Sequence, residues 1–197
     1  MQHNSRHGHA GFTLIEMLAV IAIIAILATI LVASMGYVQE KEARSKTELQ
    51  LGLLQAALQE YHHDNGSFPA TENSATGEKN SHILFNALYW DPEGDGRTPT
   101  TGATTGEKGP TRYRPDLDPL TNKQGWTSGK PSARTKIFDP WGNEYRYISS
   151  KNSSGKRNSS INNPAEDSYD LWSVGKDGKT NPASPKDKVN NDDIWVK

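Results

Sequence analysis

The feature that most constrains this chain is a continuous apolar run at residues 12–33. Of these 22 residues 19 are apolar, and the run reads FTLIEMLAVIAIIAILATILVA. A helix of this length spans roughly the 30 Å of a bilayer's hydrocarbon core. Apolar residues surround it on every side, whereas a surface helix of a soluble protein keeps them to one stripe. The run therefore predicts a transmembrane helix, and it is longer than the apolar centre of an ordinary secretory signal.

Composition excludes several classes of function for the rest of the chain. The 197 residues include no cysteine, which excludes disulfide frameworks, Cys-ligated zinc and thiol catalysis. A formal net charge of −1 argues against nucleic acid as a partner, since such proteins usually carry a basic surplus. No Ser/His/Asp set or close pair of carboxylates stands out, so we expect that the chain is not an enzyme.

One charge lies inside the apolar run, at Glu16. A carboxylate in a membrane helix costs about 2.5–3.5 kcal/mol on insertion scales. Glu16 either lies near enough to the interface to reach water, or it pairs with a positive group inside the membrane. Residues 1–11 form a short polar segment that ends in Gly11, directly before Phe12.

The stretch Gly11-Phe12-Thr13-Leu14-Ile15-Glu16 resembles the class III signal of type IV pilins and type II secretion pseudopilins. The resemblance implies that residues 1–11 are a leader, and that a prepilin peptidase cuts between Gly11 and Phe12 and methylates the new amine of Phe12. It also implies that Glu16 acts in filament assembly, because its carboxylate can neutralise the Phe12 amine of a neighbouring subunit.

The helical pattern continues through residues 34–66. Apolar residues recur there at spacings of three, four or their sums: Met35, Val38, Ala43, Leu49, Leu53, Leu54, Ala57, Leu58 and Tyr61. Asp64-Asn65-Gly66 supplies a stop, so we predict one helix over about 12–63 with an amphipathic second half. The His62-His63 pair at its end is expected to be solvated.

The resemblance implies an α+β, type IV pilin-like fold, in which a long N-terminal helix packs on a small C-terminal antiparallel sheet with long loops. Residues 67–197 would form the globular domain. Residues 58–69 and 138–147, with its Asp-Pro-Trp-Gly turn, and the stretch 169–178 resemble segments of the major, G-type pseudopilin of type II secretion. We expect their Tyr and Trp side chains to pack on the helix; a sugar-binding platform is the alternative.

Between these segments, residues 70–135 are rich in Ser, Thr, Gly and Lys and read as a variable loop with no assigned task. One apolar island, residues 83–90, could form a short helix that packs on the long one.

The C-terminal loop, about 174–193, holds the best metal candidates. Calcium binds six to eight oxygens, and clustered carboxylates without an ion would repel. The resemblance implies a structural calcium ion held by the carbonyls of Val174 and Lys179 and by the side chains of Asp177, Asp192 and Asp193. A solvated acidic tail is the alternative.

The resemblance also implies a function. The chain would be the major subunit of the type II secretion pseudopilus, anchored once in the bacterial inner membrane by residues 12–33, with its domain in the periplasm. Its partners would be copies of itself, prepilin peptidase, minor pseudopilins, membrane lipid, and an inner-membrane platform with a cytoplasmic ATPase. The alternatives are a type IV pilin for adhesion, motility or DNA uptake, and a membrane-anchored periplasmic binding module or enzyme.

Overall fold

The computed structural model of the chain describes residues 12–71, 79–90, 113–122, 125–127, 132, 134–159, 161–184 and 186–196. The predicted leader with Gly11, and parts of the predicted variable loop 70–135, lie outside these residues. By its internal contacts the chain divides into two compact units, residues 1–42 and 43–197.

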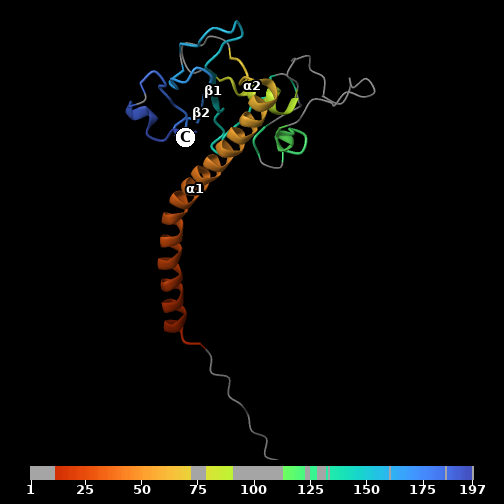
Figure 1. Cartoon of the computed structure of the whole chain (residues 1–197). Helices are drawn as coiled ribbons and strands as arrows, with labels where there is room; N and C mark the ends of the chain where they lie inside the picture. Colours follow the sequence, from red (N-terminus) through yellow and green to blue (C-terminus); the bar gives the residue numbers. More distant parts are fainter. Residues whose placement is uncertain are drawn as a thin grey trace, which may run out of the picture. The chain divides into compact units, whose positions relative to one another are not determined.

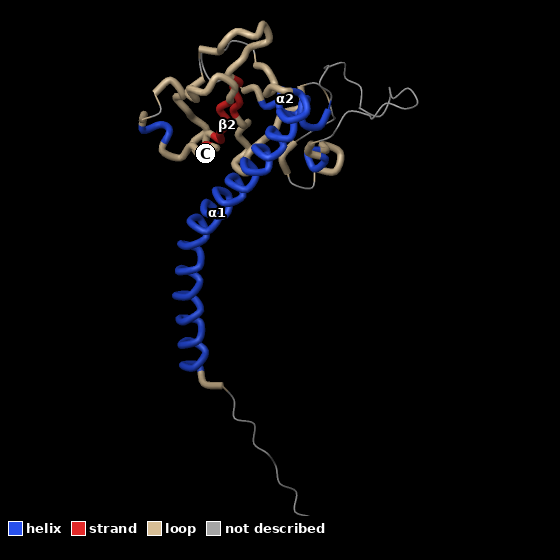
Figure 2. Tube along the Cα trace, viewed as in Figure 1, coloured by secondary structure: helices blue, strands red, loops and turns tan. Residues whose placement is uncertain are grey.

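One helix, α1, runs from Leu14 to Asn65 (Figures 1 and 2). It was predicted over 12–63 and is shifted by two residues at each end. At its start the Thr13 hydroxyl accepts a hydrogen bond from the Glu16 backbone N–H, and the Glu16 carboxylate accepts one from the Thr13 N–H. This reciprocal pattern is a capping box, so the helix begins after Thr13. At its end Gly66 takes a positive φ of 72° and closes the last turn by donating to the His62 carbonyl.

The N-terminal part of α1 is long and apolar enough to cross a membrane, and α1 is the one such helix in the described parts of the chain. The large apolar side chains from Phe12 to Val32 are all exposed in the single chain. This agrees with the transmembrane prediction for 12–33, which rests on length and composition.

The buried face of α1 begins later than predicted. Its buried residues recur at helical spacing, and they are Thr47, Gln50, Leu51, Leu54, Ala57 and Leu58. Met35, Val38 and Leu49, which the apolar pattern placed on this face, are 62%, 58% and 64% exposed. Two polar residues hold core positions instead, because their polar groups find partners: the Thr47 hydroxyl donates to the Ala43 carbonyl, and the Gln50 side chain accepts from the Tyr145 hydroxyl.

Three short strands form an antiparallel sheet in the order β1-β2-β3: Arg146–Ser149, Tyr169–Ser173 and Ile194–Trp195. This confirms the predicted α+β class and the small antiparallel sheet. Alternate residues face opposite sides of a strand. Accordingly Tyr147 and Leu171 share the main core with α1, whereas Ile148 and Trp172 belong to a second, smaller core.

The apolar island forms α2, Ser81–Phe85, continued by a π-helical turn, η1, Asn86–Trp90. Leu84, Phe85 and Leu88 are fully buried and join the main core with Leu54 and Leu58 of α1. The predicted short helix is thereby confirmed, and it packs where the pattern expected.

Candidate functional site

The first candidate site is the start of α1. The Glu16 carboxylate oxygen Oε2 accepts hydrogen bonds from the backbone N–H and the hydroxyl of Thr13, at 2.8 and 2.7 Å. Within the described residues Glu16 forms no ion pair, so its charge stands on an otherwise apolar surface. A carboxylate in this setting is expected to seek a positive partner. Phe12, 77% exposed, precedes this cap directly.

The second candidate site is the C-terminal loop, and its first half is organised by Asp177. The Asp177 carboxylate accepts a hydrogen bond from the Lys179 backbone N–H at 2.8 Å. The backbone N–H of Asp177 donates to the Asp192 carboxylate at 2.9 Å. These bonds bring the two ends of the predicted calcium loop together. The loop begins at Val174, which is buried in the second core.

Asp193 is the buried acid of the loop, at 8% exposure. Its Oδ2 accepts a hydrogen bond from the Thr180 hydroxyl at 2.7 Å, whereas its Oδ1 is buried and has no hydrogen-bond partner among the described residues. Burial raises the pKa of this carboxyl from 3.8 to about 6; the Thr180 bond and the Arg146 charge lower it, and the charges of Asp192 and Asp177 raise it. An oxygen buried in this way is suited to a cation.

Two asparagines, which sequence reasoning missed, close the long excursion between the two halves of this loop. The Asn181 N–H donates to the Asn190 side-chain oxygen at 2.6 Å, and the Asn190 amide donates to the Asn181 carbonyl at 3.0 Å. Within the excursion, Asp187 caps the short turn η3, Lys188–Asn190. The two halves are therefore held opposite each other even though the loop between them is long.

The oxygen donors of the loop suit calcium in kind, but the structure does not gather the predicted carboxylates into one group. In the part of the chain that is described, no three His, Cys, Asp or Glu side chains stand close enough to form a metal-binding group. Asp177 is turned toward Lys179, and Asp193 toward Thr180. The side chain that fits the ion best is Asp193, because its Oδ1 is buried and unpartnered.

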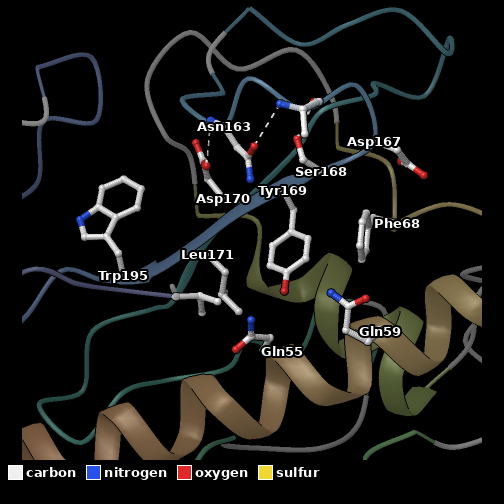
Figure 3. Close-up of a pocket in the computed structure, with 12 residues that line it drawn as sticks. Gln55, Gln59, Phe68, Asn163, Asp167, Ser168, Tyr169, Asp170, Leu171 and Trp195 are labelled. Carbon is white, nitrogen blue, oxygen red and sulfur yellow. Dashed lines mark hydrogen bonds between the residues drawn. The ribbon is translucent and has the colours of Figure 1, made fainter.

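A groove of about 280 Å³ lies between α1 and the sheet (Figure 3). In this view Gln55 and Gln59 rise from α1, and the Tyr169 ring points toward the helix. Both oxygens of Asp170 accept backbone hydrogen bonds, from Asn162 and Asn163. The groove's buried acid thus serves to hold the preceding loop.

His62, expected to be solvated, is instead engaged at the edge of this groove. Its Nε2 lies 2.7 Å from the Asp167 carboxylate, and its ring lies 4.5 Å from that of Phe68. The prediction was wrong for His62 because its partner lies about a hundred residues away in sequence. His63 is exposed, as predicted.

Three aromatic residues in or directly before the strands are fully buried. Tyr145 and Tyr147 are fully buried in the main core with α1, as predicted. Trp172 is fully buried too, but in the second core, where it stacks on Trp195 with ring centroids 4.4 Å apart. The prediction that it packs on the helix was wrong, because alternation along β2 turns Trp172 to the other face of the sheet.

Comparison with known families gives one match. A family model described as the prokaryotic N-terminal methylation motif matches residues 6–32, which include Gly11, Phe12 and Glu16. Searches of the curated proteins and of the solved structures found no match. The chain therefore carries a type IV pilin-like leader motif, which implies processing by prepilin peptidase and filament assembly in general. The motif and the long apolar helix are consistent with a single-pass anchor in the inner membrane.

Proposed function

We propose that the protein is the major, G-type pseudopilin of a type II secretion system, a filament subunit and not an enzyme. Prepilin peptidase would cut between Gly11 and Phe12 and methylate Phe12. The subunit would then be held in the inner membrane by residues 12–33, with its domain in the periplasm. It would polymerise with copies of itself and with minor pseudopilins, driven by the membrane platform and its ATPase, to export folded proteins.

The observation that carries the filament-subunit part of this proposal is the position of Glu16. It is the one ionisable residue of the 12–33 run, it stands four residues after Phe12, and its carboxylate has a partner only in Thr13 among the described residues. Cleavage after Gly11 would create a cationic amine on Phe12. In a filament this amine can neutralise Glu16 of a neighbour and fix the axial register of the subunits.

The intact mass of the protein extracted from membranes tests the processing step. We expect a mass that lacks residues 1–11 and carries one added methyl group. Glu16→Gln should still be cleaved, because the junction at Gly11 is unchanged, but it should fail to enter filaments, since the amide cannot neutralise an amine. An unprocessed wild-type chain would contradict the proposal. Surface pili lost on deletion, with secretion of folded proteins intact, would favour the type IV pilin alternative.

The C-terminal loop is proposed to bind one structural calcium ion through the carbonyls of Val174 and Lys179 and the side chains of Asp177, Asp192 and Asp193. The unpartnered Asp193 Oδ1 supports this assignment. When bound, the ion would supply positive charge that relieves repulsion between the carboxylates of the loop.

A thermal melt of the full chain in detergent, with calcium and then with chelator, tests this ion. At 100 times its dissociation constant a ligand adds about 2.7 kcal/mol, which corresponds to a rise in Tm of roughly 5–10 °C for a domain of this size. The shift should disappear in Asp177→Ala and persist in Asp118→Ala, which changes a half-buried aspartate outside the loop. Equal melting with calcium and with chelator would refute the calcium site.

A further inference from the structure

A chain of hydrogen bonds joins the second core to the C-terminal loop through Thr180, a residue that is not among the proposed calcium ligands. The indole N–H of Trp172 donates to the Thr180 hydroxyl oxygen at 3.1 Å. That hydroxyl donates in turn to Asp193 Oδ2 at 2.7 Å. Trp172 itself is fully buried and stacked on Trp195, with the two rings only 7° from parallel. The relay therefore starts from a fixed point in the sheet.

The direction of the relay is set by the chemistry of its members. An indole N–H can only donate, so the Thr180 oxygen must accept from it. The hydroxyl carries a single proton, and the carboxylate of Asp193 can only accept when ionised. The proton of Thr180 must therefore point at Asp193 Oδ2. This holds the carboxylate in one rotation and leaves Oδ1, buried and without a partner among the described residues, as its free oxygen.

The backbone beside Thr180 is fixed as well. The next residue, Asn181, is clasped to Asn190 by two hydrogen bonds, at 2.6 and 3.0 Å. Asn190 also donates to the Ser184 carbonyl at 2.9 Å. These hydrogen bonds hold the two ends of the excursion, at Asn181 and Asn190, next to each other. Thr180 therefore stays opposite Asp193.

We propose that Thr180 is a positioning residue for the cation of this loop: it holds Asp193 in the rotation that leaves Oδ1 free to bind the ion. This inference rests on the proposed calcium binding. Groups that orient metal ligands in this way contribute strongly to affinity, and their loss costs 10–100-fold. Thr180 would orient Asp193 in the same way, because it donates a hydrogen bond to Oδ2 and leaves Oδ1 for the ion.

Calorimetric titration of calcium chloride into the full chain in detergent tests the proposal. Thr180→Val keeps the shape of the side chain but neither accepts from Trp172 nor donates to Asp193, and we expect about 10–100-fold weaker calcium binding. Thr180→Ser restores the hydroxyl and should bind within about threefold of the wild type. Thr121→Val, an exposed loop threonine with one long bond to the Asp118 carbonyl, is the matched control and should bind as the wild type does.

The outcomes separate this inference from the proposal on which it rests. A wild-type chain that binds no calcium refutes the calcium site and the role of Thr180 together. A wild-type chain that binds calcium, with Thr180→Val equal to it, refutes only the role of Thr180. If Thr180→Val does not fold, Trp172→Phe removes the indole donor while keeping an aromatic ring. It should then weaken calcium binding several-fold, and unchanged binding would overturn the inference.

Discussion

Replacement of Gly175 by alanine is expected to lower the free energy of unfolding of residues 43–197 by about 2–4 kcal/mol. Gly175 has a φ of +64°, a conformation that L side chains rarely adopt. A Cβ at this position would lie 2.4 Å from the Asp192 backbone oxygen and 2.6 Å from its carboxylate. The substitution therefore adds a clash with backbone to the cost of the left-handed conformation.

The surroundings of Gly175 leave little room for relief. Its carbonyl accepts a hydrogen bond from the Asn143 amide at 2.7 Å, and its N–H donates to the Ser173 hydroxyl at 3.1 Å. Ser173 is held in turn by the buried carboxylate of Asp139. A shift of Gly175 away from Asp192 would stretch these bonds, so the strain should appear as lost stability.

Urea unfolding of the full chain in detergent, followed by tryptophan emission, measures this effect. All five tryptophans lie in residues 43–197, so the signal reports on that unit alone. Gly155→Ala is the matched control, because Gly155 has a similar φ of +73° but no atom within 4 Å of its Cβ position. Gly155→Ala should lower the free energy of unfolding by about 1 kcal/mol, which is the effect of the left-handed conformation alone. Equal losses in the two variants would show that Asp192 does not press on Gly175.

The parts of the fold that could be predicted from sequence are those written in local patterns. Local patterns predicted the helices to within a few residues: the apolar run 12–33 and the island 83–90 each indicate a helix, and Asp64-Asn65-Gly66 marks the end of the first one. Glu16 stands out for the same reason, as one charge in an apolar segment. Thr13 could have been recognised as well, since Thr followed by Glu three residues later is the signature of a capping box.

The features that escaped prediction depend on partners far along the chain. Gln50 is buried because Tyr145 donates to it, and His62 is engaged because Asp167 reaches it. No periodicity in the sequence marks either pair. Thr180 has nearer partners, Trp172 eight residues before it and Asp193 thirteen after it, but no periodicity marks these pairs either. A polar residue is buried where it finds a hydrogen-bond partner, and the sequence alone does not show which residues will pair in the fold.

Leu54→Ala should be about as damaging as the change at Gly175, with an expected loss of about 2–5 kcal/mol. Leu54 is fully buried on the core face of α1, together with Leu58 and with Leu84 of α2. Truncation removes buried methyl groups and leaves a cavity that the packed core can close only in part. The same urea unfolding followed by tryptophan emission measures the loss.

Leu49→Ala is the control that tests which face of α1 carries the core. The apolar pattern counted Leu49 with Leu54, but Leu49 is 64% exposed. Its truncation should therefore change the unfolding free energy by less than about 0.5 kcal/mol. A large loss at Leu49 with little at Leu54 would mean that α1 is rotated about its axis relative to the structure. The polar residues Thr47 and Gln50 would then have to leave the core, and the hydrogen bond that Gln50 accepts from the Tyr145 hydroxyl argues that they stay.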